Sequence, residues 1–284
     1  MGYIKSPLNY TGGKYKILDF IIPCFPKNIG TFVDLFGGGF DVGVNIKAQK
    51  IIYNDHNIFL PQMFEFFRAE GVGVVDKIYS KIKDFELSQE NKEGYLALRK
   101  EYNKTKDILD LFILTCYSFN HQIRFNSRHE FNTPFGKNRS EYNKTIEENL
   151  INFINALQEK NIEFYSNDFT SLYDFELGKN DFVYCDPPYL ISNASYNDGK
   201  RGFKNWGVNE ELQLLKLLDY LNEKGVKFAL SNVLTHKGMT NEKLVEWSKK
   251  YNIRYIEKNY NNSSYQRKNK DKETQEVLIY NYSL

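Results

Sequence analysis

The residues best suited to chemistry are Asp186, Pro187, Pro188 and Tyr189, which follow the apolar run 182–185. Such a run is typical of a buried strand, and ligands of open α/β sheets bind outside the carboxyl ends of the strands. Each proline fixes its own φ and holds the preceding residue extended, so the Asp186 carboxylate and the Pro187 carbonyl stand on a stiff backbone. These two groups can accept both N–H bonds of an exocyclic amine while the Tyr189 ring stacks on the base. This D-P-P-Y segment, residues 186–189, therefore predicts a planar substrate that carries an amine.

A second group of residues suits a nucleoside with an amino-acid tail. The apolar run 31–36 ends in three glycines, which let the backbone turn sharply and approach a ligand closely. The next apolar run ends at Asp55, whose carboxylate can accept both hydroxyls of a ribose. The spacing is not that of a dinucleotide fingerprint, and Asp34 would repel a pyrophosphate but attract a cationic amine. S-adenosylmethionine combines the ribose hydroxyls of a nucleoside with an amino-acid tail that carries a cationic amine.

Two further segments have both an ordinary and a functional interpretation. Residues 9–14 (Asn-Tyr-Thr-Gly-Gly-Lys) are typical of the loop before a helix. The backbone N–H groups of a helix start, together with Lys14, could instead bind a carboxylate. Asn167, Asp168 and Phe169 are typical of a turn, but at the end of a strand Asp168 could accept from an adenine N6 while Phe169 packs on the ring.

Composition indicates a folded protein but does not identify its partners. Hydrophobic residues make up 41% and charged residues 26%, and the net charge of +2 is too small to indicate a partner. The aromatic content of 16% fits either a Phe-rich core or rings that stack on bases. Three cysteines without paired spacing predict reduced core thiols in a cytoplasmic protein, and four scattered histidines predict no metal. No apolar segment near the N-terminus is long enough to predict a signal peptide or a membrane span.

Strand and helix signals alternate in two separate parts of the chain, which predicts an α/β fold with a parallel sheet. Helices are expected at 14–23 and 40–49, and strands at 31–36, 51–53, 162–165, 182–185, 227–230, 253–257 and 276–282. Long helical periods fill the region between the two parts, followed at 120–138 by short alternations that indicate a hairpin. This region is expected to be an inserted domain, and 259–272 a mobile loop.

Taken together, these segments resemble the Dam-type DNA adenine-N6 methyltransferases of the alpha group. The resemblance covers nearly the whole chain, because five motifs occur in the family's order: N-Y-T-G-G-K at 9–14, F-V-D-L-F-G-G-G at 32–39, N-D at 54–55, N-D-F at 167–169 and D-P-P-Y at 186–189. It implies a Rossmann-like sheet that binds S-adenosylmethionine, formed by residues 1–57 and 143–284. Residues 58–142 would form a mostly helical target-recognition domain that contains a β-hairpin and binds DNA.

The resemblance also implies a reaction and a set of site residues. The N6 amine of an adenine flipped out of duplex DNA would attack the methyl group of S-adenosylmethionine, without a metal or a covalent intermediate. The catalytic residues would be Asp186, Pro187, Pro188 and Tyr189. The cofactor would be bound by Tyr10, Gly12, Lys14, Asp34, Phe36, Gly37, Gly39, Asp55, Asp168, Phe169 and Asp186.

The inserted region resembles the family's DNA-reading hairpin at 119–126 and 131–136. Arg124 could bind guanine O6 and N7 in the major groove, or it could contact a phosphate. His121 and Gln122 stand where the family commonly carries Gly-Leu, so the recognised sequence is left open. Loop 196–203 could close over the base, or it could simply be solvated. The DNA-binding residues are expected to be Asn120, Arg124, Asn126, Asn132, Pro134, Tyr196, Lys200 and Arg201.

The expected partners are double-stranded DNA and a cognate restriction endonuclease encoded nearby, with the chain acting as a monomer or weak dimer away from membranes. A phage-encoded or solitary enzyme is the alternative setting. Alternative substrates are RNA adenine and cytosine N4, although cytosine-N4 members of this superfamily usually carry serine in place of Asp186. A non-catalytic DNA-binding protein that retains the fold is the remaining alternative.

Overall fold

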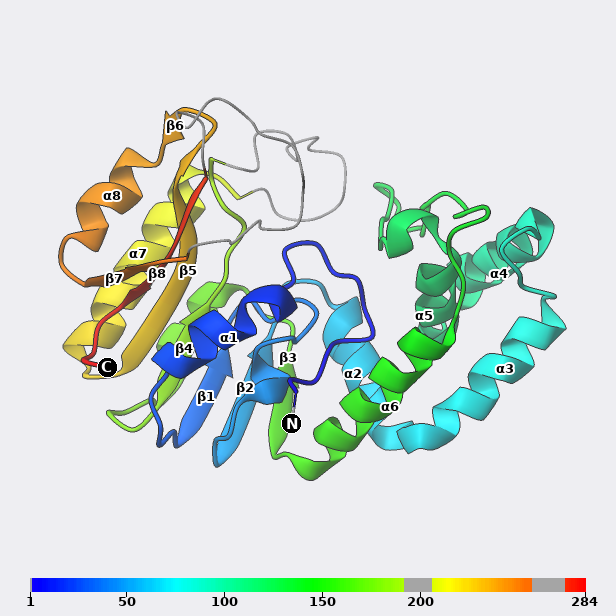
Figure 1. Cartoon of the computed structure of the whole chain (residues 1–284), viewed down its shortest axis with the longest axis horizontal. Helices are drawn as coiled ribbons and strands as arrows, with labels where there is room; N and C mark the ends of the chain where they lie inside the picture. The colour runs from blue at the N-terminus through cyan, green and yellow to red at the C-terminus, as the bar shows by residue number, and fades with distance from the viewer. Residues whose placement is uncertain (1, 192–205, 257–273) are drawn as a thin grey trace.

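The computed structural model describes residues 2–191, 206–256 and 274–284. They form a sheet flanked by helices and, beside it, a lobe built mainly of helices (Figure 1). The expected loop 259–272 and the expected DNA-binding residues Tyr196, Lys200 and Arg201 lie outside the described residues. In the described part of the chain, no helix combines the length and apolar character needed to cross a membrane.

The sheet has eight strands and is mostly parallel. Its order is β3-β2-β1-β4-β5-β8-β7, with β6 paired to β5. Strands β1 to β5 are parallel, whereas β8 runs antiparallel to both β5 and β7. The bounds are β1 Thr31–Asp34, β2 Lys50–Asn54, β3 Ile162–Tyr165, β4 Phe182–Cys185, β5 Lys227–His236, β6 Met239–Thr240, β7 Asn252–Tyr255 and β8 Gln275–Tyr280. The predicted α/β fold is confirmed in this part of the molecule.

Alternating side chains of the central strands build a separate core on each face of the sheet. Phe32 and Tyr184 belong to the cluster on one face, while Val33 and Val183 belong to the cluster on the other. All four residues are buried, because helices cover both faces of these strands. The three cysteines are free and buried in these cores, as the sequence predicted.

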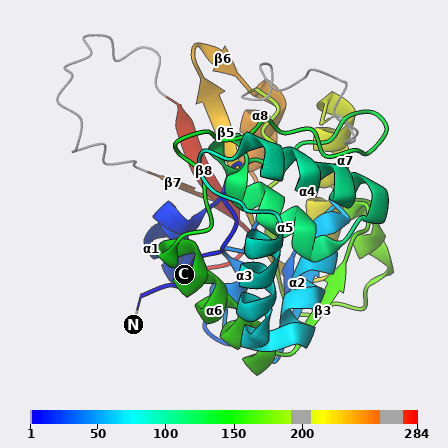
Figure 2. The same cartoon turned by 90° about the vertical axis from the view of Figure 1, so that its right-hand side faces the viewer.

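The helices divide between the sheet and the lobe. Helix α5 is buried along residues 109–117, as expected of a helix that is apolar all round. In the view of Figure 2 the helices of the lobe lie in front of the sheet. The bounds are α1 Leu18–Ile21, α2 Phe59–Glu70, α3 Val74–Asp84, α4 Lys92–Thr105, α5 Ile108–Tyr117, α6 Lys144–Glu159, α7 Val208–Glu223 and α8 Glu242–Ser248. We call α3, α4, α5 and the segment 118–142 the helical lobe; the domain boundaries at 57/58 and 142/143 stay predictions.

Two of the expected helices differ from the structure. The helix predicted at 40–49 is wrong, because Phe40 takes a φ of +66° and only the 3₁₀ turn Gly43–Asn45 forms. Phe40, Val42, Val44 and Ile46 are nevertheless buried. Their apolar character reflects this burial and not the apolar face of a helix. The helix predicted at 14–23 is divided into two 3₁₀ turns, Tyr15–Ile17 and Ile22–Cys24, around the four-residue α1.

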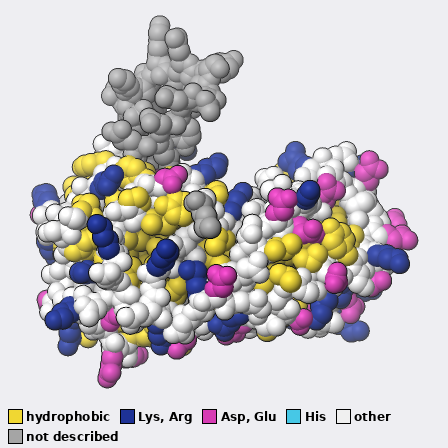
Figure 3. Space-filling model, turned by 60° about the horizontal axis from the view of Figure 1, so that its bottom comes forward, with side chains coloured by type: hydrophobic (Ala, Val, Ile, Leu, Met, Phe, Trp, Pro, Cys, Tyr) yellow, Lys and Arg dark blue, Asp and Glu magenta, His cyan; other side chains and the backbone are white. Residues whose placement is uncertain are grey.

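The expected hairpin is present only in outline. Two isolated antiparallel bridges, Ser118 with Phe135 and Phe125 with Phe131, join its arms without forming continuous strands. Basic and acidic side chains are both present across the face drawn in Figure 3.

Candidate active site

The carboxyl ends of the parallel strands meet at one edge of the sheet, where a cavity of about 550 Å³ opens. Four acidic residues lie at or shortly after the ends of four neighbouring strands, so that Asp168, Asp55, Asp34 and Asp186 occur in the sheet order β3-β2-β1-β4. Residues from all five sequence motifs line the cavity, together with part of the helical lobe. The lining segments include 8–14, 34–39, 54–57, 167–169, 186–189 and 121–124.

Two neighbouring side chains hold the carboxylate of the D-P-P-Y segment. Tyr189 Oη donates to Asp186 Oδ1 at 2.9 Å, and Lys14 Nζ pairs with Asp186 Oδ2 at 2.5 Å. Burial raises the pKa of Asp186, while the Lys14 ammonium acts to lower it. Lys14 also donates to the Gly12 carbonyl at 2.9 Å. The sequence suggested that Lys14 could bind a carboxylate. In this structure the carboxylate beside Lys14 is the side chain of Asp186.

The Tyr189 hydroxyl has a second carboxylate beside it. Its Oη lies 3.5 Å from Oε1 of Glu276, which reaches the site from β8. The Lys14 ammonium also lies 5.3 Å from the centre of the Tyr189 ring. Tyr189 is therefore fixed through its hydroxyl as well as being available as a flat surface. The sequence did not predict Glu276, since it lies far along the chain in a strand that pairs with β5.

Asp34 is a buried carboxyl at the end of β1. Its side chain is 1% exposed, and its Oδ2 accepts from the Gly43 amide at 3.0 Å. Burial raises the pKa of Asp34 to about 8, and the nearby charges of Asp186, Asp55 and Asp41 act in the same direction. The ionised form therefore favours a cation beside it.

Backbone amides orient the carboxylate of Asp55, which follows β2. The Gly38 amide donates to its Oδ2 at 2.9 Å, and the Asn57 amide donates to its Oδ1 at 2.8 Å. The glycines are needed for this approach, because Gly38 has a φ of +49° and a Cβ on Gly37 would lie 2.3 Å from the Tyr53 ring. The glycine run thus places its N–H groups against Asp55.

A pair of asparagines joins the loops after β2 and β3. Asn54 Nδ2 donates to the Asn167 carbonyl at 3.1 Å, and the Asn167 amide donates to Asn54 Oδ1 at 2.9 Å. Asp168 Oδ1 then accepts from the amide and hydroxyl of Thr170, at 3.0 and 2.7 Å. The turn expected at this point is present, and it keeps Asp168 and Phe169 at the cavity.

Three aromatic rings form one wall of the cavity. The centre of the Phe36 ring lies 5.7 Å from that of Phe169, and the Trp206 ring lies 5.5 and 5.6 Å from these two. The sequence predicted Phe36 and Phe169 but missed Trp206. No motif marks Trp206, and only the packing at the start of α7 brings it to the cavity. Asp41 and Asn57 also line the cavity and were missed because they lie outside the sequence motifs.

The helical lobe contributes its segment 121–124 to the cavity wall. Arg124 is half-buried, and Arg124 Nε and His121 Nδ1 are buried without a hydrogen-bond partner. Asn120 and Asn9 connect the lobe to the N-terminal loop, because Asn9 Nδ2 donates to the Asn120 carbonyl at 3.2 Å.

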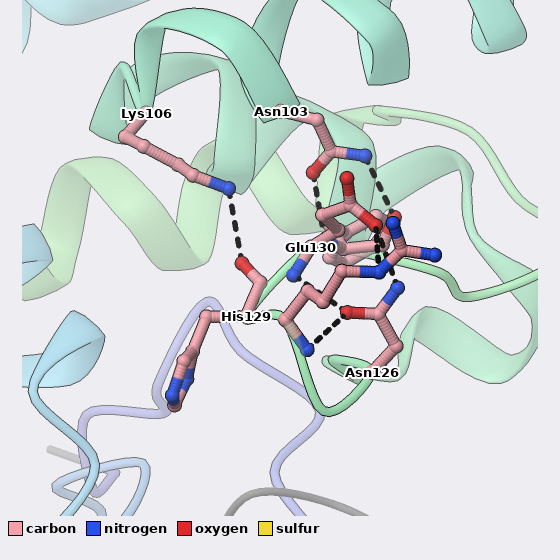
Figure 4. Close-up of polar contacts among 7 residues, drawn as sticks. Asn103, Lys106, Asn126, His129 and Glu130 are labelled. Atoms are coloured by element: carbon pink, nitrogen blue, oxygen red, sulfur yellow. Dashed lines mark hydrogen bonds and ion pairs between the residues drawn. The ribbon is translucent and has the colours of Figure 1, made fainter.

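The tip of the hairpin uses its polar side chains to hold its own shape (Figure 4). Asn126 Nδ2 donates to Glu130 Oε2 at 2.7 Å, and Asn126 Oδ1 accepts from the Glu130 amide at 3.0 Å. Asn103 of α4 accepts from the Phe131 amide at 2.8 Å, and Lys106, which follows α4, donates to the His129 carbonyl at 3.0 Å, so that both residues attach the tip. Asn126, predicted to contact DNA, is thus engaged within the turn. The other predicted residues, Asn132 and Pro134, are exposed.

Comparison with known proteins identifies the family. The model of the D12 class N6 adenine-specific DNA methyltransferases matches residues 10–262. The chain belongs to this family. It is 52% identical over 282 residues to the type II methyltransferase M.FokI of Planomicrobium okeanokoites, and 50% identical over 283 residues to the modification methylase StsI of Streptococcus sanguinis. It is 26% identical over 230 residues to the DNA adenine methylase of Haemophilus influenzae, covering 79% of this chain and 78% of that protein.

Membership of the D12 family confirms the resemblance to Dam-type methyltransferases that the motifs indicated. The alignments with M.FokI and StsI each include 99% of this chain but only 43% of the relative. The chain therefore spans less than half the length of these two relatives. The matched region contains every motif that lines the cavity except Asn9, the first residue of the N-terminal loop.

Proposed function

We propose that this chain transfers a methyl group from S-adenosylmethionine to the N6 amine of an adenine in double-stranded DNA. The observation that carries the proposal is that the D-P-P-Y segment, the glycine run and Asp55 line one cavity at the carboxyl edge of the sheet. Membership of the D12 family supports the same reaction. The cavity volume of about 550 Å³ lies in the range of small-molecule sites.

The donor set around the cavity fits S-adenosylmethionine. The Asp55 carboxylate, fixed by two amides, is suited to the ribose hydroxyls, and Phe36 and Phe169 offer apolar surfaces to the adenine ring. The buried Asp34 carboxyl is suited to the cationic amine, since burial and the neighbouring carboxylates Asp186 and Asp55 both raise its pKa and a cation would stabilise its ionised form. S-adenosylmethionine supplies, when bound, a methyl group on a positively charged sulfur.

The D-P-P-Y segment is suited to holding the target amine. A carboxylate offers about four acceptor positions; Lys14 and Tyr189 use two of those on Asp186. A position therefore remains for one amine N–H, and the Pro187 carbonyl can accept the other. This arrangement turns the nitrogen lone pair in one direction, and such alignment can contribute roughly 7–11 kcal/mol when geometry is ideal.

The target adenine must leave the duplex to reach this site, which costs roughly a few kcal/mol of unstacking. We propose that Tyr189 stacks on the flipped base and that residues 58–142 recognise the DNA. Arg124 is half-buried and lines the cavity, which supports a contact between its guanidinium and a base edge. The names of M.FokI and StsI, a type II methyltransferase and a modification methylase, support a restriction-modification setting with a cognate endonuclease.

The proposal is tested by incubating the chain with S-adenosylmethionine carrying a tritiated methyl group and with duplex DNA, single-stranded DNA or RNA. Nucleoside analysis of the duplex should detect N6-methyladenine. Asp186→Ala should nearly abolish transfer while S-adenosylhomocysteine still binds, because Asp34, Asp55 and Phe169 remain to hold the cofactor. Labelled cytosine, or transfer to RNA alone, would contradict the proposed substrate, and near-normal turnover by Asp186→Ala would contradict the role of Asp186.

A further inference from the structure

Trp206 and Glu211 form a buried pair next to the cavity, outside every motif of the family. We propose that the Trp206 indole is a wall of the adenine subsite for S-adenosylmethionine, and that Glu211 is the positioning residue that fixes this ring. The inference rests on the proposed function. It adds two residues to the cofactor site, Trp206 just before α7 and Glu211 in its first turns.

The indole is placed to contact a flat ligand. Trp206 lines the cavity and packs edge-on against Phe36, with an interplanar angle of 85°, and at 53° against Phe169. The indole plane is therefore steeply inclined to both phenylalanine rings and does not form a parallel stack with either of them. The side chain is 9% exposed, so most of its surface is already desolvated before any ligand binds. Such a rigid aromatic wall adds contact area at little entropic cost.

Glu211 holds the indole from behind. Its Oε2 accepts from Trp206 Nε1 at 2.9 Å. Its Oε1 accepts from Asn241 Nδ2 at 3.0 Å and from Asn232 Nδ2 at 3.2 Å. Glu211 is 1% exposed, and all three donors are uncharged. Burying a carboxyl is costly unless it is hydrogen-bonded, and these three hydrogen bonds offset part of that cost.

The two asparagines make the pair rigid. Asn241 is the N-cap of α8, where its Oδ1 accepts from the Leu244 amide at 3.1 Å, and Asn232 lies within β5. Glu211 is therefore tied to a strand and to a second helix while it directs the indole N–H. Burial raises the pKa of Glu211, and the three donated hydrogen bonds oppose that shift. The orientation of the ring follows from the position of this carboxyl.

The chain contains a matched control pair. Trp247 Nε1 donates to Asp219 Oδ1 at 2.9 Å, and Asp219 lies on the same helix α7 as Glu211. The Trp247 ring packs against Phe228 and Tyr251 and does not line the cavity. Removing either indole therefore removes a similar packing contact, but only one of them faces the proposed ligand.

The test measures binding of S-adenosylhomocysteine by titration calorimetry, without DNA and without turnover. Trp206→Ala should weaken binding at least tenfold, Trp206→Phe less, and Trp247→Phe should leave it unchanged. In the Trp247→Phe background, Trp206 is the remaining tryptophan, and its fluorescence should change when the ligand binds. Equal losses for Trp206→Phe and Trp247→Phe, or no change in fluorescence, would overturn the inference.

The role of Glu211 is tested by a double-mutant cycle. Glu211→Gln should weaken ligand binding in the wild-type background, but should have no further effect on affinity once Trp206→Phe has removed the indole N–H. A merely structural role would give the same loss in both backgrounds, and that result would overturn the positioning role. If wild-type protein neither binds the ligand nor methylates DNA, the proposed function fails; if it does both while Trp206→Ala binds normally, only this inference fails.

Discussion

Cofactor binding should become tighter as pH rises toward 8, because Asp34 must ionise to receive the cationic amine. Its pKa is about 8 in the free protein, against an ordinary value of 3.8. Holding the carboxylate ionised at pH 7 therefore costs about 1.4 kcal/mol, and about twice as much at pH 6. Affinity for S-adenosylhomocysteine should rise about tenfold per pH unit from pH 6 to 7.5, and about one proton should be released on binding. The prediction stops at pH 7.5 because an α-amine has a pKa of about 7.7–8.0 and loses its charge above that range.

Calorimetric titration in two buffers with different ionisation enthalpies measures both the affinity and the number of protons released. Asp34→Asn should bind more weakly and lose this pH dependence. Asp41→Asn is the control, because Asp41 is a second buried carboxyl of the same cavity with a raised pKa. An affinity that stays flat from pH 6 to 7.5, or an unchanged slope in Asp34→Asn, would refute the assignment of the amine to Asp34.

The same ionisation should affect the stability of the free protein. The folded-state pKa of Asp34 is raised, so its contribution to the free energy of unfolding is fully present below the ordinary value and is lost as pH rises through about 8. Free protein should therefore unfold at a lower temperature at pH 8 than at pH 5 if this group dominates. Added S-adenosylhomocysteine should reduce the difference.

Three other perturbations give separate results. Arg124→Ala should relax discrimination at one base pair by about 1–3 kcal/mol, whereas Arg128→Ala, at an exposed hairpin tip, should affect all sequences alike; equal weakening of all sequences by Arg124→Ala would make it a phosphate contact. Gly37→Ala should lower the free energy of unfolding by about 1–3 kcal/mol, because its Cβ would lie 2.3 Å from a buried tyrosine ring; an unchanged urea midpoint would contradict this. Lys14→Met should raise the pKa of Asp186 and shift the acid limb of the pH–rate profile to higher pH, since Lys14 acts to lower that pKa. An unshifted limb would show that Lys14 does not control the ionisation of Asp186.

The sequence predicted the strands and the residues that follow them because both depend on local pattern. Strand β4 is an apolar run of four buried residues, and the D-P-P-Y segment directly follows it. Period and neighbours along the chain are enough to locate such a site. The same reasoning failed at 40–49, where residues 40–44 are all buried and Phe40 has a positive φ that no periodic pattern encodes.

Partners from distant parts of the chain could not be predicted. Lys14 and Asp186 meet because the N-terminal loop folds over the end of β4, and Glu276 reaches them from β8. Trp206 joins the aromatic wall through the start of α7. None of these pairings has a sequence spacing that distinguishes it from chance, since tertiary packing alone creates them.

The asparagine pair after β2 and β3 has a consequence for how such proteins diversify. The chain leaves the sheet at Asn54 and returns to the neighbouring strand, which ends at Tyr165, and Asn167 then bonds back to Asn54. Everything between these strands, including the helical lobe, is in topological terms a single long excursion from two adjacent strands. One such excursion can be exchanged for another from a relative while the junction keeps its register. If the lobe selects the DNA sequence as proposed, a single recombination event could give a new sequence preference with the same chemistry.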